Sequence, residues 1–236
     1  MKILVIPDVH LKPWMFGRAK DIMDSGAAGR AVCLMDIPDD WGREHDLGLY
    51  EETFDAAVRF QKAYTDTLWC YGNHDLSYVW LKYESGFSSL AIPVVIEKLN
   101  ELKRTLPDGR QMAYVHRIDN VIFTHGGITH AFVRDHLPDT DYEDTDSVIE
   151  GINRLGRNEM WDDESPIWFR PQFIHEKMYR ERDILQVVGH TPVEEADRHG
   201  NVVSCDLFSV YRTGEPIGTQ EFLLIDTETW EHEGIR

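Results

Sequence analysis

The sequence predicts an α/β layered fold in which helices cover a central β-sheet on both faces. Short apolar runs rich in β-branched residues alternate with helical stretches over the first 125 residues, and strand patterns return from Ile184 onward. The chain has 236 residues, of which 42% are hydrophobic, so it is long enough to bury one sizeable core. We therefore expect a single domain over residues 1–236.

Three strands separated by helices open the expected order, and two further strands then join at a turn over residues 118–120. KILVIP is a continuous apolar run that ends at an acid, which is typical of a buried strand. The expected strands are residues 2–7, 30–35, 66–71, 111–116 and 120–125, and the expected helices are residues 15–26, 47–63 and 92–106. Three more strands follow over residues 184–189, 201–206 and 221–227, with a hairpin turn at His199-Gly200-Asn201.

Residues 131–182 differ from the rest of the chain. They are rich in acids and aromatics and carry weak strand signals. We expect either a cap-like insertion over a site or a helical connection. Because strands return after this region, either reading keeps it inside one domain.

Acidic residues outnumber basic ones 42 to 24, which gives a formal net charge of -18. Such a field repels nucleic-acid backbones and anionic membranes, so we expect neither polymeric nucleic acid nor a membrane as a partner. A small phosphorylated substrate remains compatible, because bound cations reverse the sign locally. The three cysteines show no metal or disulfide spacing and the N-terminus has no signal-peptide pattern, so we expect a soluble, cytoplasmic protein.

Side chains of the kinds that bind metals follow five of the predicted strands. They are Asp8 and His10, Asp36, Asn73 and His74, His125, and His190. Ligands in open α/β sheets bind at the carboxyl ends of the strands, so we expect these side chains to meet in one site. Taken singly, each has another reading, since a strand-end Asp is commonly a cap or turn residue and a lone His is commonly structural. Their occurrence at the ends of five strands of one chain favours a shared metal site.

In their order, these motifs resemble those of the calcineurin-like metallophosphoesterases. The motifs are Asp-x-His at 8–10, the strand-end Asp36, GNHD at 72–75, THGG at 124–127, SPIWFRP at 165–171 and GHTPV at 189–193. They most resemble the phosphoprotein phosphatase branch, with its bacterial and phage serine/threonine phosphatase-like members, and dinucleoside tetraphosphate hydrolases share much of the pattern. The resemblance spans residues 2–206 and implies a four-layer sandwich of mixed β-sheets flanked by helices.

The resemblance also implies roles for the matched residues. The implied ligands of two divalent metal ions are Asp8, His10, Asp36, Asn73, His125 and His190, with Asp36 shared by both ions. His74 would be the general acid, supported by Asp39, and Arg170 and Asn73 would bind the substrate phosphate. Asp40 departs from the pattern, because the family has an arginine there that clamps phosphate. This departure weakens the expectation of an ordinary phosphoprotein substrate, unless Arg43 or another arginine substitutes.

Mixed carboxylate, amide and imidazole ligands suit manganese, iron, zinc or nickel more than calcium, and we favour manganese. Two such ions generate a hydroxide nucleophile and stabilise the leaving oxygen. We therefore expect metal-bridged hydroxide to attack a phosphomonoester, with phosphoserine or phosphothreonine protein as the family-typical substrate. The alternative is a nucleotide phosphoanhydride or phosphodiester, such as a dinucleoside polyphosphate. A non-enzymatic scaffold is disfavoured, because six implied ligands and His74 are all present.

Overall fold

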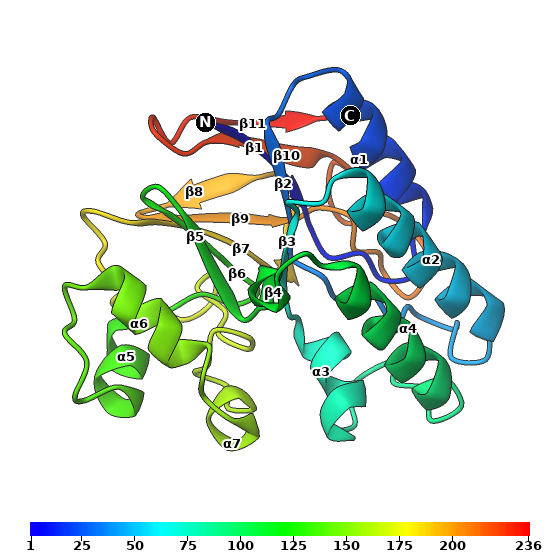
Figure 1. The fold of residues 1–236 in the computed structure, drawn as a ribbon, viewed down its shortest axis with the longest axis horizontal. Helices are drawn as coiled ribbons and strands as arrows, with labels where there is room; N and C mark the ends of the chain where they lie inside the picture. The colour runs from blue at the N-terminus through cyan, green and yellow to red at the C-terminus, as the bar shows by residue number, and fades with distance from the viewer.

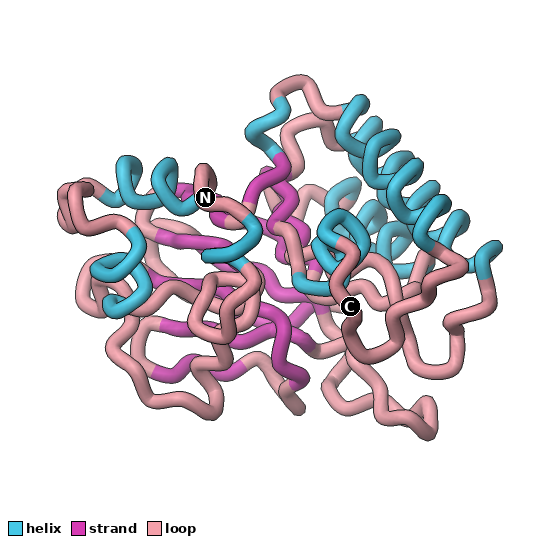
Figure 2. The backbone as a smooth tube through the Cα atoms, turned by 90° about the horizontal axis from the view of Figure 1, so that it is seen from below, coloured by secondary structure: helices cyan, strands magenta, loops and turns pink.

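Two mixed β-sheets face each other at the centre of the computed structural model, which describes residues 1–236, and helices flank the pair on both sides (Figures 1 and 2). The first sheet has six strands in the order β11-β10-β1-β2-β3-β4, and the second has five in the order β5-β6-β7-β9-β8. The four-layer sandwich is therefore confirmed. The single central sheet expected from strand–helix alternation alone is wrong, because periodicity does not show which strands pair.

The first sheet is parallel at its centre and antiparallel toward one edge. β1 pairs in parallel with β2 and antiparallel with β10. Its strands are β1 (Lys2–Ile6), β2 (Arg30–Cys33), β3 (Leu68–Cys70), β4 (Met112–Ala113), β10 (Phe222–Asp226) and β11 (His232–Ile235). The elements between them are α1 (Trp14–Asp24), α2 (Leu47–Ala63), α3 (Asn73–Trp80), α4 (Ile92–Thr105) and the 3-10 helix η1 (Gly109–Gln111).

The second sheet is built from the second half of the chain. Parallel β6, β7 and β9 form its centre, and antiparallel β5 and β8 form its edges. Its strands are β5 (Val115–Ile118), β6 (Val121–Thr124), β7 (Leu185–Pro192), β8 (Asp197–His199) and β9 (Val202–Asp206), and its helices are α5 (His130–His136), α6 (Thr145–Ile152) and α7 (Arg157–Met160).

The side chains of β1 point alternately to the two faces of the first sheet, and this explains why the two sheets stack. Leu4 and Ile6 lie in the core cluster shared with α1, α2 and α4, whereas Ile3 and Val5 lie in a second cluster with residues of β6, β7 and β9. Successive side chains of a strand point to opposite faces, so an entirely apolar strand buries both. A third cluster fills the space between the second sheet and α5–α7. Three apolar layers therefore hold four layers of structure together.

Most predicted elements occupy their expected places, and α2 spans the predicted residues 47–63. Several elements were not predicted, among them η1, β8, α3 and β11. The short helix α3 begins inside GNHD, whose residues were interpreted as ligands, and β11 lacks an apolar run. Residues 131–182 contain α5, α6 and α7 and no extended sheet strand.

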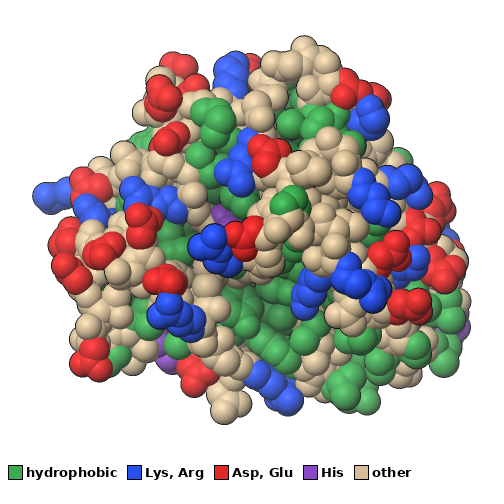
Figure 3. All heavy atoms as spheres, viewed as in Figure 1, with side chains coloured by type: hydrophobic (Ala, Val, Ile, Leu, Met, Phe, Trp, Pro, Cys, Tyr) green, Lys and Arg blue, Asp and Glu red, His purple; other side chains and the backbone are tan.

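On the face seen in Figure 3, acidic and basic side chains lie interspersed, so the net charge of -18 does not form a single acidic patch there. No helix of the chain combines the length and the apolar character needed to cross a membrane.

Candidate active site

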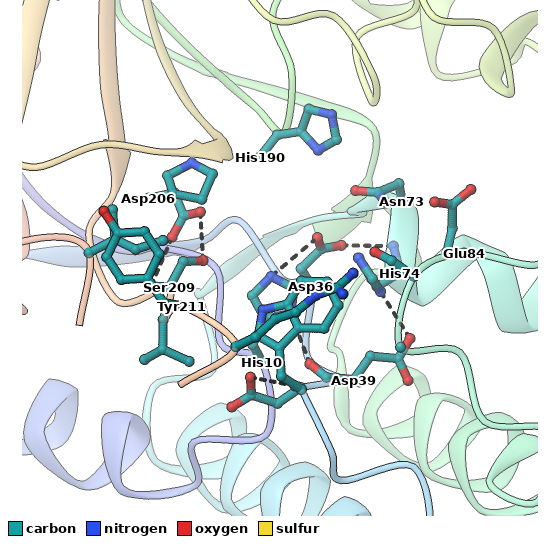
Figure 4. Close-up of a pocket in the computed structure, with 18 of the residues that line it drawn as sticks. His10, Asp36, Asp39, Asn73, His74, Glu84, His190, Asp206, Ser209 and Tyr211 are labelled. Atoms are coloured by element: carbon teal, nitrogen blue, oxygen red, sulfur yellow. Dashed lines mark hydrogen bonds and ion pairs between the residues drawn. The ribbon is translucent and has the colours of Figure 1, made fainter. Parts of the chain in front are cut away.

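The segments that follow β1, β2, β3 and β9 converge with the end of β7 on one pocket, whose lining includes His10, Asp36, His74 and His190 (Figure 4). Four of the predicted site residues have left-handed backbone conformations, with φ of 43° at His10, 41° at Asp36, 66° at Asp39 and 65° at His190. Non-glycine residues adopt this conformation at an energetic cost, and such residues cluster at functional sites.

The carboxylate of Asp36 lies at the centre of the site. Its Oδ2 atom is 3.1 Å from Nε2 of His125 and 3.9 Å from Nε2 of His10, while Oδ1 accepts a hydrogen bond from the backbone N–H of His74 at 2.9 Å. His10 follows β1 of the first sheet and His125 follows β6 of the second sheet. Asp36 therefore links side chains from both sheets. Burial opposes its charge, but the nearby His125 and His74 hold the pKa of Asp36 well below its usual range.

Backbone carbonyls orient two of the histidines. Nδ1 of His125 lies 3.0 Å from the carbonyl oxygen of Leu34, and Nδ1 of His10 lies 2.9 Å from that of Asp39. A carbonyl can only accept, so each Nδ1 carries the proton and each Nε2 presents its lone pair to the site when the ring is neutral. Metal-binding histidines are usually held in this way.

Two buried polar atoms of the predicted metal ligands have no hydrogen-bond partner. They are Oδ1 of Asp8 and Nε2 of His190. The second oxygen of Asp8 accepts the backbone N–H of His190 at 2.8 Å. An unsatisfied buried acceptor is costly, and a bound cation would satisfy both atoms.

Two glycines make room for the carboxylates. A Cβ atom at Gly72 would lie 1.9 Å from Oδ1 of Asp36, and one at Gly189 would lie 2.0 Å from Oδ1 of Asp8. Any side chain at either position would displace a predicted ligand. The unpartnered atoms and these two glycines together fit a site shaped around cations.

Two groups of side chains present ligand atoms close enough to hold an ion. One consists of His10, Asp36 and His74, and the other of Asp36, His125 and His190. They share Asp36, as the two predicted metal positions do. Asn73 lies beside the second group, with its Oδ1 3.1 Å from Nε2 of His125. The first group contains His74 where the sequence predicts Asp8.

His74 is held by a buried acid. Its Nδ1 lies 2.9 Å from Oδ2 of Asp39, whose Oδ1 accepts hydrogen bonds from the hydroxyls of Tyr50 at 2.8 Å and Tyr78 at 2.5 Å. Burial disfavours a charged imidazole, but Asp36 and Asp39 outweigh it and raise the pKa of His74 to about 9. The two acids therefore favour the protonated ring, which is the form that a proton donor needs.

Arg170 reaches the pocket from the region between α7 and β7. Its Nη1 donates to the carbonyl oxygen of His190 and to the hydroxyl of Thr191, each at 3.0 Å. The side chain is half-buried and lines the pocket, which has a cavity volume of about 360 Å³. The structure thus brings Arg170 to the site.

The position of the missing family arginine is occupied by an ion pair. Oδ2 of Asp40 lies 3.4 Å from Nζ of Lys12, which also donates to the carbonyl oxygen of His10 at 3.1 Å. Lys12 is almost completely buried. Asp40 therefore neutralises a lysine next to the site. Arg43 does not line the pocket.

Two buried acids of the site were not predicted. Asp75 accepts backbone N–H groups from Asp36 at 2.8 Å and Gly72 at 3.1 Å, and burial together with Asp36 raises the pKa of Asp75 to about 7. Asp206 ends β9, lines the pocket and accepts both the N–H and the hydroxyl of Ser209. The strand-end signal that marked the other acids is also present in NVVSCD and would have found Asp206.

Comparison with known proteins agrees with this geometry. The sequence profile described as calcineurin-like phosphoesterase matches residues 1–214. The chain belongs to the calcineurin-like phosphoesterase family. Members of this family are metal-dependent phosphoester hydrolases, and we assign the chain to that class of enzyme. The resemblance noted in the sequence is thereby confirmed at the level of the family, though not of the phosphoprotein phosphatase branch.

Solved structures show the same fold. The cold-active protein-tyrosine phosphatase of a psychrophilic Shewanella species is 18% identical with a TM-score of 0.64, and the match covers 100% of this chain and 80% of that one. A mutant form of a cold-active protein tyrosine phosphatase is 15% identical with a TM-score of 0.56 over the same shares of the two chains. A further cold-active protein tyrosine phosphatase structure is 17% identical with a TM-score of 0.54, covering 99% and 78%. No curated protein sequence matches the chain.

Proposed function

We propose that the chain is a dinuclear metal-dependent phosphatase that hydrolyses phosphomonoesters, with phosphorylated protein side chains as its substrate class. The observation that carries the proposal is that Asp36 belongs to two ligand groups, with His10 on one side and His125 and His190 on the other. His74 also lies in the first group, but its Nδ1 is bonded to Asp39, and we assign it the role of acid and not of ligand. One such group would make a mononuclear site. Two groups joined by one carboxylate are the arrangement expected for a pair of ions that act together.

The metal ligands in this proposal are the six predicted residues, Asp8, His10, Asp36, Asn73, His125 and His190. The ions would supply Lewis-acid charge toward the phosphate and activate water. Manganese suits the mixed oxygen and nitrogen donors, as do iron, zinc and nickel. Further hydrogen bonds hold the ligands in place. The carbonyl oxygen of Leu34 accepts from His125, and Asp75 accepts three backbone N–H groups, one of which is that of Asp36.

His74 would donate a proton from Nε2 to the departing oxygen of the substrate. Its Nδ1 is occupied by Asp39, so Nε2 is the free position. Tyr50 and Tyr78 hold Asp39 in place from the opposite side. The imidazole is therefore oriented before the substrate arrives, which lowers the cost of reaching the transition state.

Arg170 and Asn73 would hold the phosphoryl group. One Nη of Arg170 is fixed by the protein, while the remaining guanidinium donors are available to phosphoryl oxygens. Arg170 and the neighbouring Trp168 belong to residues 131–182 and line the pocket, so we propose that this insertion forms part of a cap over the site.

The test is a side-by-side assay after the metal-free protein has been loaded with manganese. The substrates are an aryl phosphomonoester, its diester, phosphoserine and phosphotyrosine peptides, and a dinucleoside polyphosphate. We expect the monoester and the phosphopeptides to be hydrolysed fastest. Hydrolysis of only the diester or the dinucleotide would replace this proposal by the nucleotide alternative. In an Asp36→Asn variant the activity should fall by several orders of magnitude, and an unchanged rate would show that the site is not catalytic.

A further inference from the structure

We propose that Arg212, which stacks on Trp41 at the rim of the pocket, binds a second anionic group of the substrate, distinct from the phosphoryl group that is hydrolysed. This inference rests on the proposed phosphomonoesterase function of the same site. It concerns which phosphomonoesters the site prefers, and it makes Arg212 a specificity-determining residue.

Three lysine and arginine side chains line the pocket, and two of them already have partners in the protein. They are Lys12, Arg170 and Arg212. Lys12 pairs with Asp40, and Arg170 donates to His190 and Thr191. Arg212 makes no hydrogen bond and no ion pair with the protein, so all of its guanidinium donors are available. It is exposed, whereas Arg170 is half-buried. Arg212 is therefore placed for a part of the substrate that projects toward the rim.

The guanidinium of Arg212 is held in place by an aromatic ring. Its Cζ atom lies 4.6 Å from the centroid of Trp41, which is 39% exposed. Trp41 follows β2 and Arg212 lies between β9 and β10, so the stack joins two loops that both line the pocket. Stacking restricts the arginine without using its hydrogen-bond donors. A restricted side chain loses less entropy when an anion binds.

Asp40 sets up this arrangement. One oxygen of Asp40 accepts the backbone N–H of Trp41 at 2.8 Å, and the other lies beside Lys12. Asp40, which stands where the family has an arginine, therefore neutralises the charge of Lys12. It also fixes the backbone of Trp41 in the loop after β2. The unpaired positive charge on this wall is then that of Arg212.

One acidic side chain of the pocket disfavours a second anion. Glu84 lines the pocket, and in Figure 4 it lies beside His74. An anionic group on the substrate is repelled by the Glu84 carboxylate and attracted by the guanidinium. The charges thus favour one orientation of an anionic substrate.

Stacking alone does not identify a binding residue, because the same contact occurs elsewhere in the chain. Arg18 lies 5.7 Å from the ring centroid of Trp14, is exposed and makes no ion pair, but it does not line the pocket. Arg18 therefore offers a matched control for Arg212, with the same charge and the same type of contact.

The experiment compares meta-carboxyphenyl phosphate with phenyl phosphate, a pair that differs by one carboxylate. We expect wild-type protein to prefer the carboxylated ester in kcat/KM, and Arg212→Ala to lower that preference by roughly three- to tenfold. Arg18→Ala should keep the wild-type preference. Trp41→Ala should lower it and Trp41→Phe should restore it, because phenylalanine keeps a ring beneath the guanidinium. An Arg212→Ala preference equal to the wild-type value would overturn the proposal.

Binding of non-hydrolysable analogues separates this inference from the proposed function. Meta-carboxybenzyl phosphonate and benzyl phosphonate are titrated into the manganese-loaded protein by calorimetry, so no turnover is required. If neither ester is hydrolysed but Arg212→Ala still weakens only the carboxylated phosphonate, the phosphatase proposal fails and Arg212 keeps its role. Equal affinities of wild type and Arg212→Ala for both phosphonates would contradict the role of Arg212 directly.

Discussion

Nδ1 of His74 lies 2.9 Å from Oδ2 of Asp39, and neither residue is more than slightly exposed, with side-chain accessibilities of 12% and 1%. The carboxylate is also bonded by two tyrosine hydroxyls on its other oxygen. A charged pair held this way favours the imidazolium form and fixes the ring plane.

The first prediction concerns this acid. Replacing His74 by Asn removes the proton donor while keeping a polar side chain, so turnover of an alkyl phosphate should fall by about 10²- to 10⁴-fold. A nitrophenyl phosphate needs less help from an acid, and its turnover should fall much less. The measurement is kcat for both substrates after manganese loading. Equal losses on the two esters would argue against a proton-transfer role, and metal content determined in parallel shows whether the ligands were disturbed.

The second prediction concerns the glycine beneath Asp8. A Cβ at Gly189 would lie 2.0 Å from Oδ1 of Asp8, so Gly189→Ala must move that carboxylate or the backbone. We expect metal affinity to fall by about 10- to 100-fold, the loss typical of changes to the groups that support metal ligands. Metal retained after dialysis against a weak chelator measures this.

Gly17 is the control for that substitution. It lies in α1, and nothing stands within 4 Å of a Cβ built there. Gly17→Ala should leave metal binding intact and stabilise the fold by about 0.5–1 kcal/mol, because alanine is the better helix former. Wild-type metal retention by Gly189→Ala would show that the clash is relieved without cost to the site.

A pH dependence of stability follows from His116, which lies away from the proposed ligands. Its Nε2 lies 3.1 Å from the carbonyl oxygen of Trp69, and burial lowers the pKa of His116 to about 4. The unfolded chain titrates this group near the ordinary value of about 6.5 and takes up a proton that the folded chain refuses. Stability should therefore be full above about pH 6.5, fall as the pH drops toward 4, and lose about 3 kcal/mol over that range from this residue.

Urea unfolding at several pH values measures this effect. A His116→Gln variant keeps a donor for the Trp69 carbonyl but cannot titrate, so its stability should depend less steeply on pH over the same window. All other groups titrate in both proteins, and the difference between the two curves isolates His116. Parallel curves would mean that the ring is solvated or protonated in the folded state.

The strand ends were predictable because apolar strand and polar ligand are adjacent in the sequence. Asp8, Asp36 and His125 could be found from local pattern alone. Local pattern does not show that two sheets stack on each other. The stacking depends on contacts between residues far apart in the chain, such as those of Val5 with the second sheet. The two-sheet architecture was reached only through the family resemblance.

The contacts that support the site could not be predicted from the sequence either. Tyr50 lies within α2 and Tyr78 within α3, where a helical pattern presents them as ordinary core residues. Only the packing of these helices brings both hydroxyls to Asp39. The stack of Arg212 on Trp41 likewise joins residues from loops far apart in the chain, so no spacing rule could have shown it.

The last prediction tests the charge of the proposed metal centre through Asn73. Its Oδ1 lies 3.1 Å from Nε2 of His125, among ligands that include two carboxylates. Asn73→Asp keeps an oxygen in the same place but adds a negative charge. The added charge should bind the metal ions more tightly and weaken the attraction for a phosphate dianion, so metal should resist chelation longer while kcat/KM falls by roughly ten- to a hundredfold. Asn73→Ala separates charge from ligation, because it should lose metal rather than retain it. A variant Asn73→Asp that hydrolyses phosphomonoesters as fast as wild type would show that the neutral amide is not needed to keep the site positive.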